Sequence, residues 1–146
     1  MKTKVYLAGY SGETEYRKYV KRMWGDVLTA FDPMTEVDAE IVAKAKNRSL
    51  TKEEVANIVI SDKEEIESSN YLVAYVERFS AGTMMEIMYA WQEGIPVYVI
   101  STKESMRKDV WIDYHTTKSF KTIDECFEEI LAEIVDKATN SWNRNI

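Results

Sequence analysis

The segment 71–91 constrains the fold most strongly, because two different hydrophobic patterns follow each other within it. Residues 71–76 are apolar and prone to form strands, and no polar residue interrupts them before Glu77. This run predicts a central parallel strand that is covered on both faces. From Thr83 onward the apolar residues follow helical spacing, at Met84, Ile87, Met88 and Trp91. The segment therefore predicts a strand, a short loop and a helix.

The rest of the chain repeats this alternation. Further strands are predicted at about residues 3–8, 27–31 and 95–100, with an edge strand at 119–121. Helices are predicted between them, at about residues 13–24, 37–45, 51–60, 61–69 and 122–138. Because crossovers between parallel strands are right-handed, these helices should lie on both faces of the sheet. We predict an α/β fold: a three-layer α/β sandwich with a mainly parallel sheet of the Rossmann or flavodoxin type.

Composition narrows the class of protein. With 146 residues, 45% of them hydrophobic, and no linker-like segment, the chain fits one domain over residues 1–146. A net charge of −6 argues against a nucleic-acid binder, although a small phosphate-bearing ligand stays open. The single cysteine, Cys126, excludes an intramolecular disulfide and a cysteine zinc cluster. Without a signal peptide or a long apolar span, we expect a cytoplasmic protein with no membrane partner.

Glu86 is the leading candidate for a functional residue. Ligands of open α/β sheets bind in the crevice at the carboxyl ends of the strands, which Glu86 would face from the start of its helix. A structural role competes, because Thr83 and Glu86 have the spacing of a capping box, and four other Ser/Thr–Glu pairs in the chain share it. The apolar neighbours of Glu86 would desolvate its carboxylate, which is costly for an unpaired acid without a function.

The first loop offers a second, weaker signal. Gly9 and Gly12 follow the first strand and would let the backbone approach an anion at the helix start, but they match neither a dinucleotide glycine pattern nor a P-loop. Tyr6 lies within the first predicted strand and is expected to be a core aromatic residue. Tyr10 directly follows Gly9 and is better placed to reach a ligand. Asp62 stands at a predicted helix start, and its position alone favours an amino-terminal helix charge over a catalyst.

Together these elements resemble the nucleoside 2-deoxyribosyltransferase family, which includes deoxynucleoside monophosphate N-glycosidases. The resemblance covers roughly residues 4–100 and rests on four elements: Tyr6-Leu-Ala-Gly9, Asp62 before the central strand, Ser80-x-Gly82-Thr-x-x-Glu86, and Gly94-x-Pro-Val. It implies that Glu86 attacks the anomeric carbon, that Asp62 assists departure of the base, and that Tyr6 orients the nucleophile. By analogy with retaining glycosidases, the two carboxyl groups should lie about 5 Å apart. No cofactor and no metal is implied.

Ser80 indicates whether the substrate carries a 5′-phosphate. In the family, transferases of free nucleosides usually carry an aspartate at the matching position, whereas the monophosphate hydrolases carry a serine. A carboxylate would repel a 5′-phosphate, while a serine hydroxyl can donate to it. Because the first loop lacks the arginine that the hydrolases can place there, positive charge would have to come from Arg78, Arg17 or a neighbouring subunit. The expected substrate-binding residues are Gly9, Tyr10, Arg78, Ser80 and Gly82.

These considerations favour cleavage of the N-glycosidic bond of a (deoxy)nucleoside 5′-monophosphate, with release of the free base and the sugar phosphate. One alternative is a nucleoside 2-deoxyribosyltransferase that exchanges bases between free deoxynucleosides. Another is a non-catalytic nucleotide-binding sensor module of similar architecture.

Family resemblance also implies assembly, because its members complete their sites across a dimer interface. The chain carries aromatic and apolar residues with no obvious place in a monomer core, namely Trp111, Tyr114, His115, Trp142 and Ile146. Such residues are enriched in interfaces. We therefore expect a homodimer or a larger even homo-oligomer, in which the loop 101–117 of one subunit approaches Ser80 and Glu86 of the other.

Overall fold

The computed structural model describes residues 2–35 and 38–144. Within them, one five-stranded sheet has the order β2-β1-β3-β4-β5, and every neighbouring pair of strands is parallel. The strands are β1 (Lys4–Gly9), β2 (Thr29–Phe31), β3 (Tyr71–Tyr75), β4 (Val97–Ile100) and β5 (Lys118–Phe120). The helices are α1 (Thr14–Trp24), α2 (Ala39–Lys46), α3 (Lys52–Glu67), α4 (Ala81–Gln92), α5 (Glu104–Arg107), α6 (Val110–Tyr114) and α7 (Ile123–Arg144). The predicted α/β class is confirmed.

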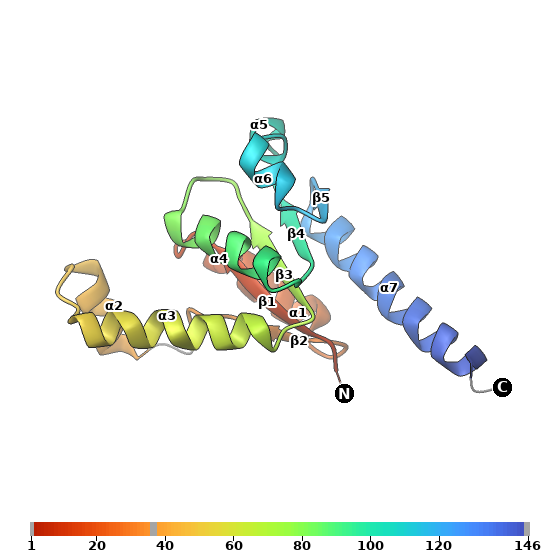
Figure 1. Cartoon of the computed structure of the whole chain (residues 1–146), viewed down its shortest axis with the longest axis horizontal. Coiled ribbons are helices and arrows are strands. Elements are labelled where there is room, and N and C mark those ends of the chain that lie inside the picture. The colour runs from red at the N-terminus through yellow and green to blue at the C-terminus, as the bar shows by residue number, and fades with distance from the viewer. Residues whose placement is uncertain (1, 36–37, 145–146) are drawn as a thin grey trace.

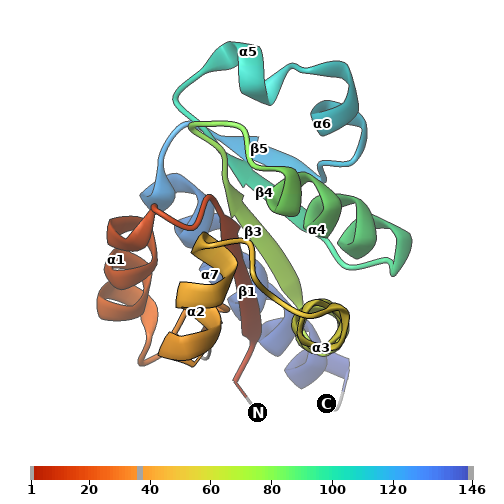
Figure 2. The ribbon, with the colours of Figure 1, turned by 90° about the vertical axis from the view of Figure 1, so that its left-hand side faces the viewer.

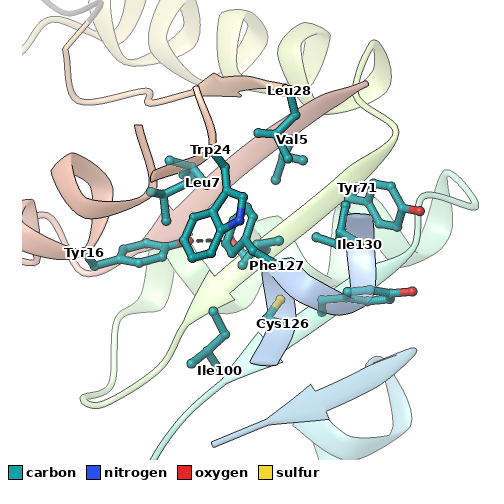
Figure 3. Close-up of a cluster of buried hydrophobic side chains, with 13 residues drawn as sticks. Val5, Leu7, Tyr16, Trp24, Leu28, Tyr71, Ile100, Cys126, Phe127 and Ile130 are labelled. Atoms are coloured by element: carbon teal, nitrogen blue, oxygen red, sulfur yellow. Dashed lines mark hydrogen bonds between the residues drawn. The ribbon is translucent and has the colours of Figure 1, made fainter. Parts of the chain in front are cut away.

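Helices cover both faces of the sheet, as the two views of the ribbon show (Figures 1 and 2). Helices α1 and α7 pack on one face, where Trp24 stacks on Phe127 within a large aromatic and aliphatic cluster (Figure 3). Helices α3 and α4 pack on the other face through Ile66, Ile87 and Ala90. Because side chains alternate along a strand, β1 contributes Val5 and Leu7 to the first core, and Tyr6 and Ala8 to the second.

The strand order locates the crevice. From β1 the chain passes to β2 at one edge, and then returns to β3 on the opposite side of β1. Connections that leave neighbouring strands in opposite directions open a crevice at the carboxyl ends of those strands. Here that point lies between β1 and β3, so the loop 10–13 and the loop 76–80 border it.

One helix boundary was predicted wrongly. Residues 51–60 and 61–69 were expected to form two helices, but α3 runs without interruption from Lys52 to Glu67. The expected capping box of Thr51 and Glu54 is present at its start. A second box at Ser61 cannot act, because the preceding helical turn already supplies carbonyl partners for the amides that it would cap. Asp62 therefore lies inside a helix and is not an amino-terminal helix charge.

The start of α4 also differs from the prediction. Ser80, rather than Thr83, caps this helix, and its hydroxyl accepts the Thr83 N–H at 3.4 Å. Glu86 consequently lies in the second turn and takes no part in a capping box. The buried residues of α4 are Thr83, Ile87 and Ala90, whereas Met88 and Trp91 of the predicted stripe are exposed. Met85, expected to desolvate Glu86, is 73% exposed.

One carboxylate adds polar contacts to the apolar packing of helix α7 on the sheet. Glu133 accepts hydrogen bonds from the hydroxyls of Tyr71 and Tyr98, and from the ammonium of Lys118 at 3.0 Å. Cys126 lies on the same helix and is fully buried, as expected of a small hydrophobe. Trp142 is exposed near the end of α7, and Ile146 lies outside the described residues. Over the described part of the chain, α7 and the other helices all lack the combination of length and apolar character that a bilayer span needs.

Candidate active site

The site is built around the carboxylate of Glu86. Glu86 lies on the flank of α4 that faces α3, beside the residues that α4 buries against the sheet. Tyr6, on the central strand β1, is fully buried and donates its hydroxyl hydrogen bond to Oε2 of Glu86. The Tyr6 ring stacks on Phe31 of β2, with ring centroids 5.7 Å apart. A rigid strand and a packed aromatic ring therefore fix the orientation of this carboxylate.

The environment of Glu86 favours its protonated form. Burial raises its pKa to about 7, against opposing effects from the Tyr6 hydrogen bond and the charge of Arg17, while the charge of Asp62 raises it further. Burial also raises the pKa of the Tyr6 hydroxyl well above its usual value, and the nearby carboxylate of Glu86 adds to this. Tyr6 thus remains a hydrogen-bond donor throughout the physiological pH range.

Asp62 is the second carboxyl group of the site. It projects from the middle of α3, is partly buried, and lies close enough to Glu86 and Tyr6 for its charge to raise the pKa of both. Burial and, secondarily, the neighbouring Glu65 raise the pKa of Asp62 to about 6.

The loop that leads into α4 is fixed by the segment that follows β4. The carboxylate of Glu77 accepts the backbone N–H of Thr102 at 2.5 Å and the Thr102 hydroxyl at 2.7 Å. Lys103 donates its ammonium to the carbonyl of the same residue, Glu77, at 2.6 Å. Ser80 is partly buried at the end of this loop, and a side chain added at Gly82 would meet no atom within 4 Å. Gly82 therefore borders open space at the helix start.

The first loop approaches the same crevice from β1. Gly9 has a φ of +156°, and a Cβ there would lie 3.2 Å from the carbonyl oxygen of Tyr75, so this position favours glycine. Tyr10 is 37% exposed, and the guanidinium of Arg78 lies over its ring, 4.6 Å from the centroid. Arg78 is also 3.5 Å from the carboxylate of Glu13. Tyr10 and Arg78 thus link the two loops that border the crevice.

Sequence reasoning missed two residues of this neighbourhood. Phe31 supports the Tyr6 ring, and nothing in its sequence context distinguishes it from an ordinary strand residue. Arg17 was expected only as a possible source of positive charge for a ligand, yet its side chain is 2% exposed and its Nη1 and Nη2 donate to backbone carbonyls of the same subunit. The burial of Arg17 could have been predicted from the sequence. Arg17 stands on the same helical face as Tyr16, Val20 and Trp24, which α1 also buries.

An apolar groove lies on the other flank of α4. Its volume is about 370 Å³, and its lining includes Phe79, Met84, Met88, Trp111 and His115. Helical geometry places Met84 and Met88 nearly opposite Glu86 around α4. The lining of this groove includes two ionisable side chains, and both have structural roles. Asp109 caps α6, and Nδ1 of His115 is 2.7 Å from the Trp111 carbonyl.

His115 is not an exposed interface residue, contrary to the prediction. It is 6% exposed and is surrounded by the rings of Trp91, Trp111 and Tyr114. Trp111 and Tyr114 themselves are 73% and 67% exposed, so they remain candidates for an interface. Among the residues that the structure describes, no group of three His, Cys, Asp or Glu side chains could hold a metal ion.

Comparison with solved structures identifies the fold. A 2-deoxyribosyltransferase from Bacillus psychrosaccharolyticus superimposes with a TM-score of 0.67 at 16% identity, over 84% of this chain and 89% of that one. A conserved protein from Enterococcus faecalis V583 gives 0.67 at 19% identity, over 91% and 99% of the two chains. A 2-deoxyribosyltransferase from Leishmania mexicana gives 0.59 at 17% identity, over 89% and 97%.

Sequence comparisons gave no further relatives, because neither a protein-family model nor a curated protein matches the chain. The structural similarity covers nearly the whole length of both partners in each case. It confirms, at the level of the fold, the resemblance to the nucleoside 2-deoxyribosyltransferases that the motifs indicate. At these identities the similarity extends to the fold and no further.

Proposed function

We propose that the chain is an enzyme that breaks the N-glycosidic bond of a nucleoside or nucleotide through a covalent glycosyl-enzyme on Glu86. The observation that carries this proposal is the carboxylate of Glu86 on α4, hydrogen-bonded by the buried Tyr6 and accompanied by a second carboxyl group of raised pKa. A nucleophile and an acid of this kind are what the reaction requires.

The reaction proceeds in two steps. In the first, an oxygen of ionised Glu86 forms a bond to the anomeric carbon, the bond from that carbon to the base breaks, and the base takes a proton from Asp62. In the second, water or another base attacks the same carbon, the bond to Glu86 breaks, and the proton lost by the attacking group returns to Asp62. Tyr6 donates to one oxygen of Glu86 and thereby directs the other towards the sugar.

Base exchange between deoxynucleosides is supported by the fold, since two of the similar structures are 2-deoxyribosyltransferases. Hydrolysis of a 5′-monophosphate is supported by Ser80 at the start of α4. The Ser80 hydroxyl accepts the Thr83 N–H and can still donate its own proton to a phosphate oxygen. Arg78 is 61% exposed beside the same loop and offers positive charge, whereas Arg17 is buried and engaged.

A product assay distinguishes the candidates. The protein is incubated with each (deoxy)nucleoside and its 5′-monophosphate, with and without a second base, and the products are separated. An exchanged nucleoside indicates transfer, and free base with sugar phosphate indicates hydrolysis. Nucleotide binding without any product, unchanged in Glu86→Gln, would contradict the proposal and favour a sensor module.

The phosphate claim predicts a selective effect of Ser80→Asp. We expect kcat/KM for the 5′-monophosphate to fall about a hundredfold more than for the nucleoside, because the new carboxylate repels the phosphate. Aspartate is a good helix N-cap, so α4 should keep its start. Steady-state kinetics on both substrates measure the effect, with Ser80→Ala as the uncharged control. Equal losses on the two substrates would contradict the phosphate claim and leave the role of Glu86 intact.

We also propose that the enzyme works as a homodimer or a larger even homo-oligomer. The side chains of Phe79, Trp111 and Tyr114 are each more than 60% exposed, and Phe79 and Trp111 line the apolar groove beside α4. Exposed apolar surface of this kind is characteristic of interfaces. In such an assembly the segment 101–117 of one subunit would approach Ser80 and Glu86 of the other.

Trp111→Glu should therefore shift the mass measured by light scattering towards the monomer and lower the activity together with it. Val27→Glu changes another exposed apolar residue, 53% exposed and remote from the groove, and should leave both properties unchanged. A wild-type protein that is monomeric at assay concentration and fully active would contradict this prediction.

A further inference from the structure

Arg17 makes an unusual set of contacts for a buried cation. Its Nη2 donates to the carbonyl of Gly9 at 2.8 Å, and its Nη1 donates to the carbonyls of Tyr10 at 3.1 Å and Glu13 at 3.4 Å. All three acceptors belong to the end of β1 and the loop that follows it. The guanidinium group therefore determines the path of the loop that carries Tyr10.

The same side chain reaches the neighbouring strand. Its Nε lies 3.3 Å from Oδ1 of Asp32, which directly follows β2 and is 5% exposed. This contact is an ion pair without hydrogen-bond geometry, because Nε has no hydrogen-bond partner. The two oxygens of Asp32 also accept the N–H of Met34 at 2.9 Å and the ammonium of Lys21 at 3.2 Å. Arg17 thus ties the carboxyl ends of β1 and β2 together beside the crevice.

We propose that Arg17 is a positioning residue of the active site, which holds the β1–α1 loop at the crevice and provides a fixed positive charge on the side of the site facing α1. This proposal rests on the proposed function in so far as Glu86 is the nucleophile. A purely apolar residue could fill the space on the inward face of α1, but it would leave the carbonyls of Gly9 and Tyr10 without these donors. Burying a cation is costly, and here the cost is offset by three carbonyl acceptors in the first loop and by the charge of Asp32.

The charge of Arg17 acts on the reacting group. The charged or titratable side chains that influence Glu86 come from three elements: Tyr6 on β1, Asp62 on α3 and Arg17 on α1. Burial and Asp62 favour the protonated form of Glu86, whereas Tyr6 and Arg17 favour the carboxylate. Arg17 is the one cation in this set, so it promotes the ionised form that can attack the sugar.

The test combines three variants of the full-length protein. Arg17→Met removes both the charge and the donors, Arg17→Lys keeps the charge but not the forked geometry, and Arg22→Met removes an exposed charge from the same helix as a control. The pKa of Glu86 is measured by carbon-13 NMR titration of the free protein, which needs no substrate. Activity is measured as separate values of kcat and KM.

We expect Arg17→Met to raise the pKa of Glu86 and to lower kcat near neutral pH, because less of Glu86 is then ionised. Arg17→Lys should leave the pKa of Glu86 near the wild-type value and mainly raise KM, because the loop with Tyr10 loses its fixed path. If Arg17→Met does not fold, Arg17→Lys is compared with wild type instead. A raised KM with little change in kcat would then support the proposal.

A pKa of Glu86 that is unchanged in Arg17→Met, or an Arg17→Lys variant with wild-type KM, would overturn the proposal and leave Arg17 a structural residue. These outcomes are distinguishable from failure of the proposed function. If the protein cleaves no nucleoside or nucleotide, the NMR titration still reports whether Arg17 acts on Glu86.

Discussion

Replacing Glu86 with alanine should lower kcat/KM by a factor of about a thousand or more, which corresponds to several kcal/mol of lost transition-state stabilisation. The variant lacks the atom that bonds to the anomeric carbon, so the reaction would have to proceed without a covalent intermediate. Tyr6 would also lose the acceptor of its buried hydroxyl. Glu86→Gln retains the shape of the side chain and a hydrogen-bond acceptor, but its neutral amide is not a nucleophile, so its loss of activity should be nearly as large.

The covalent intermediate gives a direct measurement beside the rates. Mass spectrometry of protein quenched during turnover should show one added glycosyl group on the peptide that contains Glu86, and none in Glu86→Gln. Glu93→Gln alters an exposed carboxylate just after α4 and is the matched control, with activity expected within about twofold of wild type. Near-normal turnover by Glu86→Ala would refute the role of Glu86 as nucleophile.

The fold was predictable because buried parallel strands are readable from sequence. The segment 71–76 was expected to form the central strand, and β3 spans Tyr71–Tyr75 between β1 and β4. Its residues from Tyr71 to Ala74 are all buried, which is the property that an uninterrupted apolar run reports. The order of the strands in the sheet could not be predicted in this way. It depends on the connections between the strands, and no local sequence pattern shows their course.

Helix boundaries and faces were less predictable. The predicted break at Ser61 relied on a capping pattern, which has meaning only where the chain is not already helical. The predicted stripe of α4 assumed that its largest apolar residues face the core, whereas small Ala90 and polar Thr83 lie against the sheet. Close packing of this helix on the strands selects for size, so Met88 and Trp91 are left outside.

The pairing of Tyr6 with Glu86 was predicted from the family resemblance rather than from spacing. Spacing alone predicted a capping role for Glu86 and a core position for Tyr6. Tyr6 is indeed buried in the core. Eighty positions separate the two residues, so only the crossover from β1 to β3 brings them together. Arg17 shows the converse case: its position on the buried face of α1 was visible in the sequence, but its partners were not.

Asp62→Asn should produce the second large loss, of about a hundredfold to ten-thousandfold in kcat/KM, because the departing base then lacks its proton donor. The size of the loss should depend on the leaving group. A purine nucleotide methylated at N7 carries a cationic base that departs as a neutral molecule, so it needs no protonation. With that substrate the activity of Asp62→Asn should approach the wild-type value, whereas a general structural defect would lower both activities equally.

The pH dependence provides the most specific test of the two roles. The reaction requires ionised Glu86 and protonated Asp62, and burial raises the pKa of both groups, to about 7 and about 6. The kcat/KM of wild type should therefore follow a bell, which rises up to about the pKa of Asp62 and falls above about that of Glu86.

Removing the Asp62 carboxyl group should change the form of this curve. In Asp62→Asn the remaining requirement is ionised Glu86, so the residual kcat/KM should rise with pH and then stay level, without a falling limb. The midpoint of the rise should lie below 7, because the negative charge that raises the pKa of Glu86 is gone. A falling limb that persists in Asp62→Asn would assign the required proton to another group, and Asp62 would then lose its proposed role as the acid.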